Sequence, residues 1–180
     1  TKTYNKINQV ILAFKMLIPI STVVLLLSTH FHSSNFSAAG HFAPYGIKSI
    51  FAALPLAGVI YSFIGFNPAI QLAAETKNPR RAIPIAIFGA LGITIVLYTL
   101  IQVAFIGALP SSSLQHGWKA LTFTGDNGPF AGLLTGLGFA WFAKALYVDA
   151  TVSPFGTAMV HAMATSRLTL AMSENDHFPN

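Results

Sequence analysis

Residues 61–84 read YSFIGFNPAIQLAAETKNPRRAIP, and the middle of this stretch is an unusual way to build an apolar helix. Gly65, Asn67 and Pro68 stand close together between long apolar runs. Glycine and proline both weaken an α-helix, because glycine adds backbone freedom and proline lacks an N–H. The stretch then ends in four charged residues: Glu75, Lys77, Arg80 and Arg81. We therefore predict a helix that is broken in its middle and followed by a basic turn.

The composition identifies the class of protein. Only 8% of the 180 residues are charged and 53% are hydrophobic, with a mean hydropathy of +0.62, whereas soluble domains carry about 25% charged residues. We predict an all-α integral membrane protein. The ten Lys and Arg residues are scattered between apolar blocks and form no continuous basic face, which excludes a nucleic-acid partner. The chain begins without a methionine and stops at HFPN, so we expect a fragment of a longer protein.

Four membrane-spanning segments are predicted from apolar runs of about 17 to 25 residues, the length that crosses about 30 Å of hydrocarbon. The first three cover residues 7–28, 47–75 with a break near 64–68, and 83–109. Pro84 can begin the third span, because a missing N–H costs nothing at the first helical position.

The last apolar region, residues 129–172, is too long for one simple span. It allows two crossings that turn at Ser153 and Pro154, or a short external helix over 129–143 followed by one crossing over 144–172. We favour the second arrangement, because TVSPFG lacks the charged residues of an exposed turn and a membrane helix tolerates proline when neighbours satisfy the freed carbonyl.

The basic residues predict the orientation of the spans. Cytoplasmic loops of membrane proteins are enriched in Lys and Arg. One side of the predicted topology carries six of these residues: Lys2, Lys6, Lys77, Arg80, Arg81 and Arg167. Lys48 and Lys119 fall on the other side. We therefore expect both ends of the chain and the TKNPRR turn in the cytoplasm, with the protein in the plasma or inner membrane.

The broken helix is the candidate functional feature. Unpaired backbone groups cost several kcal/mol in lipid, so a helix breaks at membrane depth only where the break is buried in protein or lines a wet cavity. The break lies about ten residues, or about 15 Å, from Glu75 and hence near the bilayer midplane. Secondary transporters hold substrates at breaks of this kind. The alternative is a kinked structural helix with a packing glycine.

Two motifs resemble those of the amino acid-polyamine-organocation permeases. SFIGF followed by AAETKNPRRAIPIAI is similar to the sixth membrane helix and the following turn of that family, and TSRLTLAMSENDHFP at residues 165–179 is similar to the end of its eighth helix. The resemblance covers essentially the whole chain and corresponds to helices five to eight of about twelve. It implies part of a leucine-transporter-like fold with two inverted repeats. It also implies that the missing helices supply the other half of the substrate site, so this piece alone is not expected to transport.

The resemblance implies a substrate-binding segment at the break. It comprises seven residues: Tyr61, Ser62, Phe63, Ile64, Gly65, Phe66 and Asn67. Backbone groups of this segment would meet the substrate, and Phe63 or Phe66 would form an aromatic gate, although ordinary apolar packing also explains either phenylalanine. Several relatives have a glutamate where this chain has Asn67, which puts a proton role at that position in doubt.

Lys15 and His161 are candidates for proton coupling. A lysine inside a membrane helix is costly enough to suggest function, and the resemblance implies that Lys15 replaces a sodium ion by its protonated amine. Its alternative is snorkelling to the cytoplasmic interface. His161 lies near the expected midplane and could carry a proton, or it could be a neutral imidazole bonded between helices. Asp149, expected near the outer mouth, would pair with Lys144 or be hydrated.

The remaining polar residues are expected to act in topology and gating. This group comprises Glu75, Lys77, Arg80, Arg81 and Arg167. His30 and His32 form an H-x-H pair, but metal binding needs further ligands, so no metal site is predicted. No cofactor is expected either, and the sequence shows no catalytic constellation of an enzyme.

The leading hypothesis is secondary active transport of amino acids or related amines by alternating access, through proton symport or exchange. The partners it implies are the substrate, protons, the lipid bilayer and the missing helices of the parent permease. The alternative is a free-standing four-helix scaffold or assembly protein, which predicts a reading frame that ends near Asn180.

Overall fold

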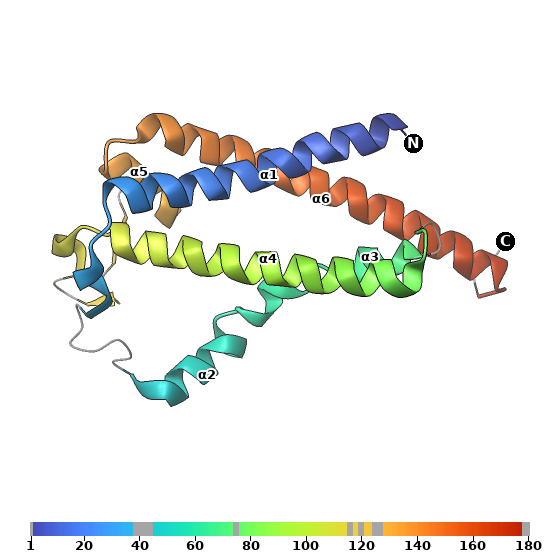
Figure 1. Cartoon of the computed structure of the whole chain (residues 1–180), viewed down its shortest axis with the longest axis horizontal. Helices are drawn as coiled ribbons and strands as arrows, with labels where there is room; N and C mark the ends of the chain where they lie inside the picture. Colours follow the sequence, from blue (N-terminus) through green and yellow to red (C-terminus); the bar gives the residue numbers. More distant parts are fainter. Residues whose placement is uncertain are drawn as a thin grey trace. The chain divides into compact units, whose positions relative to one another are not determined.

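The computed structural model describes residues 2–37, 45–73, 76–114, 117–118, 121–123 and 128–177. All the regular structure in these residues is helical, as the composition predicts (Figure 1). The α-helices are α1 (Lys2–Thr29), α2 (Gly46–Leu56), α3 (Asn67–Gln71), α4 (Pro79–Ala108), α5 (Pro129–Gly136) and α6 (Ala140–Glu174). Short 3₁₀ helices are η1 (Ser33–Ser37), η2 (Ile60–Phe63) and η4 (Ser111–Leu114).

Two helices of the described residues are long and apolar enough to cross a membrane: Lys6–Thr29 within α1, and α4. A third span is possible if α2 and the segment Ile60–Gln71 form one bent crossing, with a bend of 57°. Helix α6 is long enough to cross a membrane but is not among these apolar helices; it contains Lys144, Asp149 and His161 among its apolar residues. A count of four crossings therefore stays a prediction.

The helix α4 begins earlier than the span predicted for residues 83–109. Its first residue is Pro79, so Pro84 lies inside the helix. Asn78, with a φ of 55°, precedes Pro79, and its carbonyl accepts hydrogen bonds from the N–H groups of Arg81 and Ala82, both at 3.0 Å. Pro79 occupies the first helical position that the sequence analysis assigned to Pro84, for the same reason that no N–H is needed there.

The last apolar region contains one short and one long helix. Helix α5 ends at Gly136 and α6 begins at Ala140, after Gly138 with a φ of 87°. The long helix thus starts four residues before the predicted crossing at 144. Ser153 and Pro154 both lie inside α6, where the two-crossing alternative required a turn.

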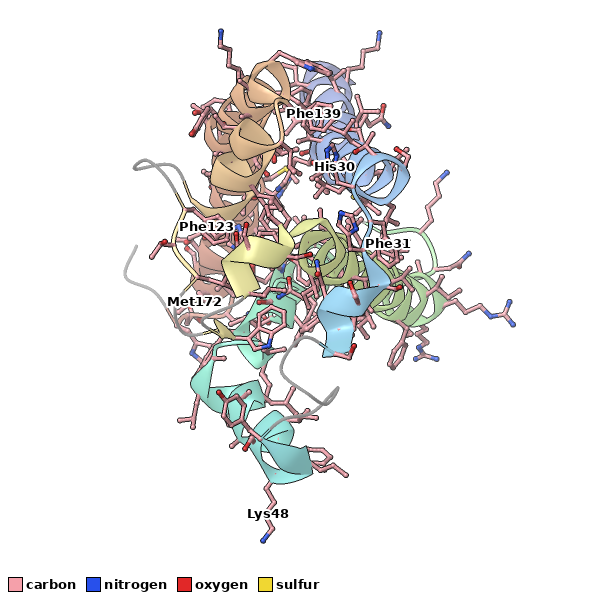
Figure 2. The ribbon with its side chains drawn as sticks, turned by 90° about the vertical axis from the view of Figure 1, so that its left-hand side faces the viewer. His30, Phe31, Lys48, Phe123, Phe139 and Met172 are labelled. Carbon is pink, nitrogen blue, oxygen red and sulfur yellow. The ribbon has the colours of Figure 1, made fainter. Side chains whose placement is uncertain are left out.

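The chain forms two compact units, each described here by itself. Unit 1 comprises Thr1–Ile50 and Val96–Ser153. Its apolar core gathers side chains from α1, the end of α4, α5 and the start of α6, with Leu26, Leu109 and Leu134 fully buried. The rings of His30 and Phe139, both labelled in Figure 2, meet nearly at right angles with centroids 5.7 Å apart.

The segment after α1 closes the C-terminal end of α4 within unit 1. Asn35, on η1, is 2% exposed, and its Nδ2 donates to the carbonyls of Ile106 (2.9 Å), Gly107 (3.3 Å) and Leu109 (2.8 Å). The His32 N–H also donates to the Gly107 carbonyl at 2.8 Å. These bonds use carbonyls that the end of a helix leaves without intrahelical donors.

Unit 2 comprises Phe51–Ile95 and Pro154–Asn180. Pro68 and Ala164 are among its buried residues. Large apolar side chains on its part of α4 are exposed, including Ile85 at 71% and Phe88 at 74%.

Candidate substrate-binding site

The α-helical backbone is interrupted from Ala57 to Phe66, a longer stretch than the sequence predicted. Helix α2 ends at Leu56, one residue after Pro55. Gly58 follows with a φ of 73°, the left-handed conformation in which a residue just past a helix end is usually glycine. The break therefore begins at Ala57, seven residues before the predicted 64–68 segment, because α2 ends at Leu56 and Gly58 follows it.

The second part of the interruption contains the predicted binding segment. The 3₁₀ helix η2 covers Ile60–Phe63, and its short-range bonds include Ser62 N–H to the Val59 carbonyl at 3.2 Å and Ile64 N–H to the Tyr61 carbonyl at 3.5 Å. Helix α3 then starts at Asn67, with Pro68 in its first turn. Hydrogen bonds between residues three positions apart have poorer geometry than the four-residue bonds of an α-helix, so they hold the backbone less tightly.

The structure places six of the seven predicted site residues on the irregular segment between α2 and α3, and the seventh, Asn67, is the first residue of α3 (Figure 1). Phe63 is half-buried and the other six are exposed. Gly65 does not have a left-handed φ, and a Cβ built on it meets no atom within 4 Å. Gly65 thus has open space beside its backbone, and its predicted contact with a substrate stays a prediction.

The charges of Lys15 and Asp149 attract each other within unit 1. Lys15 lies on α1 and is half-buried, and its ammonium is the positive charge that attracts the Asp149 carboxylate of α6. Asp149 lies nine residues after Ala140, the first residue of α6, and its expected place near the outer mouth stays a prediction. The expected pairing with Lys144 is not the one found, since residues five apart on a helix point about 140° away from each other.

His161 is exposed on α6, and its Nδ1 lies 3.0 Å from the Thr157 carbonyl of the preceding turn. A carbonyl can only accept, so Nδ1 carries the proton and Nε2 is the nitrogen that a second proton would reach. This bond joins His161 to its own helix, whereas the structural alternative placed it between helices.

The described gate residues all belong to unit 2, just before and at the start of α4 and on α6. Glu75 lies outside the described residues. Lys77, Arg80 and Arg81 are exposed, and Asn78 to Arg81 border a hollow of about 470 Å³. Arg167 is exposed on α6. In the described part of the chain, no group of three or more His, Cys, Asp or Glu residues could hold a metal ion.

The sequence analysis missed two residues that shape these sites. Gly58 ends α2, and its signal was the Pro55-x-x-Gly58 spacing, which resembles a helix end followed by a glycine cap. Asn35 holds the end of α4, but an isolated Asn in a polar loop carries no signal of its own in the sequence.

Known proteins similar to this chain are membrane transporters. The family model described as amino acid permease matches residues 1–180. The glutamate/serine transporter AimA of Bacillus subtilis (strain 168) is 41% identical over 177 residues, which are 98% of this chain and 32% of AimA. The aspartate-proton symporter of the same organism is 38% identical over 174 residues, 97% of this chain and 33% of the symporter.

A plant protein extends this similarity. The vacuolar cationic amino acid transporter 4 of Arabidopsis thaliana is 30% identical over 141 residues, 78% of this chain and 21% of the transporter. No solved structure matches the chain. The chain spans about a third of the length of the two Bacillus relatives.

The apolar helices, the two sequence motifs and the similarity to transporters agree on one class of protein, a membrane permease and not an enzyme. The chain belongs to the amino acid permease family, within the amino acid-polyamine-organocation superfamily.

Proposed function

We propose that the protein is a secondary carrier that moves amino acids or related amines across the membrane. The observation that supports this most is the family match, which extends over all 180 residues. The two Bacillus relatives are named as transporters of glutamate and serine and of aspartate, the latter with protons as the coupling ion. We therefore favour an amino acid substrate and proton symport or exchange.

The substrate site in this proposal is the irregular segment from Tyr61 to Asn67. Its 3₁₀ bonds hold the backbone loosely, and the space beside Gly65 is open. Backbone N–H and C=O groups can bind the ammonium and carboxylate of an amino acid without a charged side chain. Phe63 and Phe66 would cover the bound substrate as a gate.

Proton coupling in this proposal uses Lys15 and His161. Lys15 attracts Asp149, so loss of its proton would change the force between α1 and α6 within unit 1. His161 can take a proton at Nε2, since Nδ1 is bonded to Thr157.

The proposed whole protein has a leucine-transporter-like fold with four of its crossings in this chain. Its missing helices would complete the substrate site, and both ends of the chain would face the cytoplasm of a cell or inner membrane. Alternating access would occur around the break, with Glu75, Lys77, Arg80, Arg81 and Arg167 near the cytoplasmic gate. Residues 1–180 alone would not transport.

Uptake by the full-length protein in proteoliposomes tests the proposal. Radiolabelled glutamate, serine and aspartate would be offered with and without an inward proton gradient, and protein-free liposomes serve as the control. We expect uptake of at least one amino acid. Absence of uptake of any amino acid or amine under both conditions would contradict the proposal.

The coupling residues need a separate measurement. Uptake would be measured against pH in Lys15→Ala and His161→Ala, with Lys48→Ala as the matched control on α2. We expect a flattened pH profile in at least one of the first two variants. An unchanged profile in both removes them as coupling residues while leaving transport itself established.

A further inference from the structure

The start of α4 carries a cluster of positive charge. Lys77, Arg80 and Arg81 stand within five positions of one another, and all three are exposed. Among the described residues, their side chains make no hydrogen bond and no ion pair. Asn78 to Arg81 border a hollow of about 470 Å³. This basic cluster therefore has both the charge and the room to hold an anionic group.

The length of α4 places the basic cluster at the depth of lipid headgroups. Helix α4 is a candidate membrane span of 30 residues, which is about 45 Å long at 1.5 Å per residue. The hydrocarbon core of a bilayer is about 30 Å thick, and about 40–45 Å with its headgroup layers. When a helix of this length crosses the bilayer, its first turn, with Arg80 and Arg81, reaches the layer that contains the lipid phosphates.

Side chains are the main hydrogen-bond donors at this helix start. Pro79 has no N–H, and the N–H groups of Arg81 and Ala82 already donate to the Asn78 carbonyl at 3.0 Å. A guanidinium group can form two parallel hydrogen bonds with a phosphate, and it is more weakly hydrated than an ammonium group. Arg80 and Arg81 are therefore suited to bind a phosphate.

An apolar strip continues from Arg81 along the same face of α4. Its members are Ile85, Phe88 and Gly92, which all lie within about 40° of the direction of Arg81 around the helix axis. Ile85 is 71% and Phe88 is 74% exposed, and a Cβ built on Gly92 meets no atom within 4 Å. The strip leaves room for a hydrocarbon chain about 6–17 Å from Arg81 along the axis.

The half-buried residues of α4 lie on the opposite side of the helix. Ile83, Ile87 and Thr94 are half-buried, and they point at least about 120° away from Arg81. Within unit 2, α4 thus buries part of the face opposite to the apolar strip. The Arg81 face is left for a molecule with an anionic head and an apolar tail.

From these observations we infer that the start of α4 binds an anionic phospholipid. Arg80 and Arg81 donate to its phosphate, Lys77 adds a third positive charge, and one acyl chain lies along the apolar strip. A free phosphate gains nothing from the strip. A zwitterionic lipid carries its own cation beside the phosphate, and the basic cluster repels that cation. The two parts of the surface together therefore select an anionic lipid.

Native mass spectrometry of the full-length protein in detergent tests this inference. The probe is dioleoyl phosphatidylglycerol, and dioleoyl phosphatidylcholine is the control lipid with the same chains and a zwitterionic headgroup. We expect phosphatidylglycerol to bind at least about tenfold more tightly, because each basic residue near the headgroup adds attraction to a net negative charge. Equal affinities for the two lipids would overturn the inference.

Arg81→Gln tests the position of the headgroup. Because it removes one of the charged contacts, it should weaken the binding of phosphatidylglycerol about fivefold. Lys6→Gln is the matched control, since Lys6 is an exposed cation at the start of the candidate span in α1, and it should leave the affinity unchanged. An unchanged affinity in Arg81→Gln, or an equal loss in Lys6→Gln, would contradict a site at α4.

A second pair of variants tests the apolar strip without changing a charge. Phe88→Ala removes the ring that the acyl chain contacts, so the affinity for phosphatidylglycerol should fall about three- to tenfold. Ile93→Ala is its control, because Ile93 is also exposed on α4, at 59%, but points about 120° away from Arg81. Equal losses in the two variants would show that the chain has no defined position, contrary to the inference.

Glycerol phosphate distinguishes a lipid from a free phosphate as the ligand. It keeps the phosphate and the glycerol of the lipid but has no acyl chain, so an excess of it should leave phosphatidylglycerol bound. Complete displacement would show a site for soluble phosphates and would contradict the inference.

Amino acid uptake, measured in parallel, keeps this inference apart from the proposed function. Lipid binding requires only that the protein is folded, so lipid selectivity without uptake would contradict the proposed carrier and leave the lipid site intact. Conversely, reduced uptake with unchanged lipid affinity in Arg81→Gln would support the gating role proposed for Arg81 and contradict the lipid site.

Discussion

The side chain of Asn35 donates to three carbonyls at the end of another helix, α4. Asn35→Ala removes the donor and leaves these buried carbonyls without it. We expect the free energy of unfolding to fall by about 1–3 kcal/mol, measured as a lower Tm of the purified protein in detergent.

Asn175→Ala is the control for this loss. The Asn175 amide also donates to a carbonyl, that of Ala171 at 2.7 Å, but it is exposed at the end of α6. Its removal should change the free energy of unfolding by less than about 0.5 kcal/mol. Equal changes in the free energy of unfolding in Asn35→Ala and Asn175→Ala would show that the burial of Asn35 adds nothing to stability.

The attraction between Lys15 and Asp149 is measurable by a double-mutant cycle. Lys15→Met and Asp149→Asn each leave one charge uncompensated, and the double variant removes both. We expect the double variant to be more stable than the sum of the single changes predicts, by about 0.5–1 kcal/mol for this half-buried pair. The cycle of Lys144→Met with Asp149→Asn should be additive, and coupling there instead would reverse the assignment.

Single residues were predictable from the sequence where they broke a local rule. Lys15 is a cation in an apolar run and Gly65 is a glycine beside a proline, so both stood out. The partners of Asn35 and Asp149 were not predictable, because they are backbone carbonyls more than 70 positions away and a lysine more than 130 positions away in the chain, respectively. A single sequence carries no record of such contacts.

At the scale of elements, Gly58 and Gly65 have different roles in the broken helix. Gly58 has a φ of 73° with free space around it, so Gly58→Ala adds backbone strain without a clash. We expect a loss of about 1 kcal/mol in the free energy of unfolding. The measurement is the Tm of the variant relative to the unmodified protein.

Gly65→Ala is the matched change in the same interruption. Its φ is not left-handed and its Cβ meets nothing, so stability should be unchanged or rise slightly, by about 0.4–1 kcal/mol. If the substrate lies against this backbone, the added methyl group should nevertheless reduce uptake by the full-length protein. Normal uptake by Gly65→Ala would show that the substrate does not lie against the Gly65 backbone.

The lengths of the apolar runs predicted most of the helices, but they did not predict the residues at which the helices begin and end. Two prolines can each begin α4, and the sequence does not say that Asn78 adopts the left-handed φ that allows Pro79 to do so. Likewise, Pro55 and Gly58 end α2, while Pro19 and Pro154 leave their helices continuous. The difference depends on which neighbours replace the missing hydrogen bond.

At the scale of the whole molecule, the orientation across the membrane is open to a direct test. Residues 1–180 contain no cysteine, so single cysteines can be added within this segment to a full-length protein from which any cysteines outside it have been removed. With a membrane-impermeant maleimide applied to intact cells, Ser34→Cys and Ser112→Cys should be labelled and Asn175→Cys should not. Labelling of Asn175→Cys alone would reverse the proposed orientation.

Family membership was the part of the whole-molecule reading that the sequence supported best, because two motifs occur in the right order. The number of crossings was harder, since α6 mixes apolar residues with Lys144, Asp149 and His161 and its hydropathy alone does not identify a span. Such a helix is satisfied only when its polar residues face other protein or water. The relatives are about three times as long as this chain. Many of the protein surfaces that the polar residues of α6 face would therefore belong to helices outside residues 1–180.

The amide of Asn35 ties the segment after α1 to the last carbonyls of α4. If α1 or α4 tilts at this end, the other helix must therefore move with it, or the three hydrogen bonds of Asn35 must break together. During a transport cycle these two helix ends would travel together as a single lever arm, and bending would have to occur elsewhere along their length.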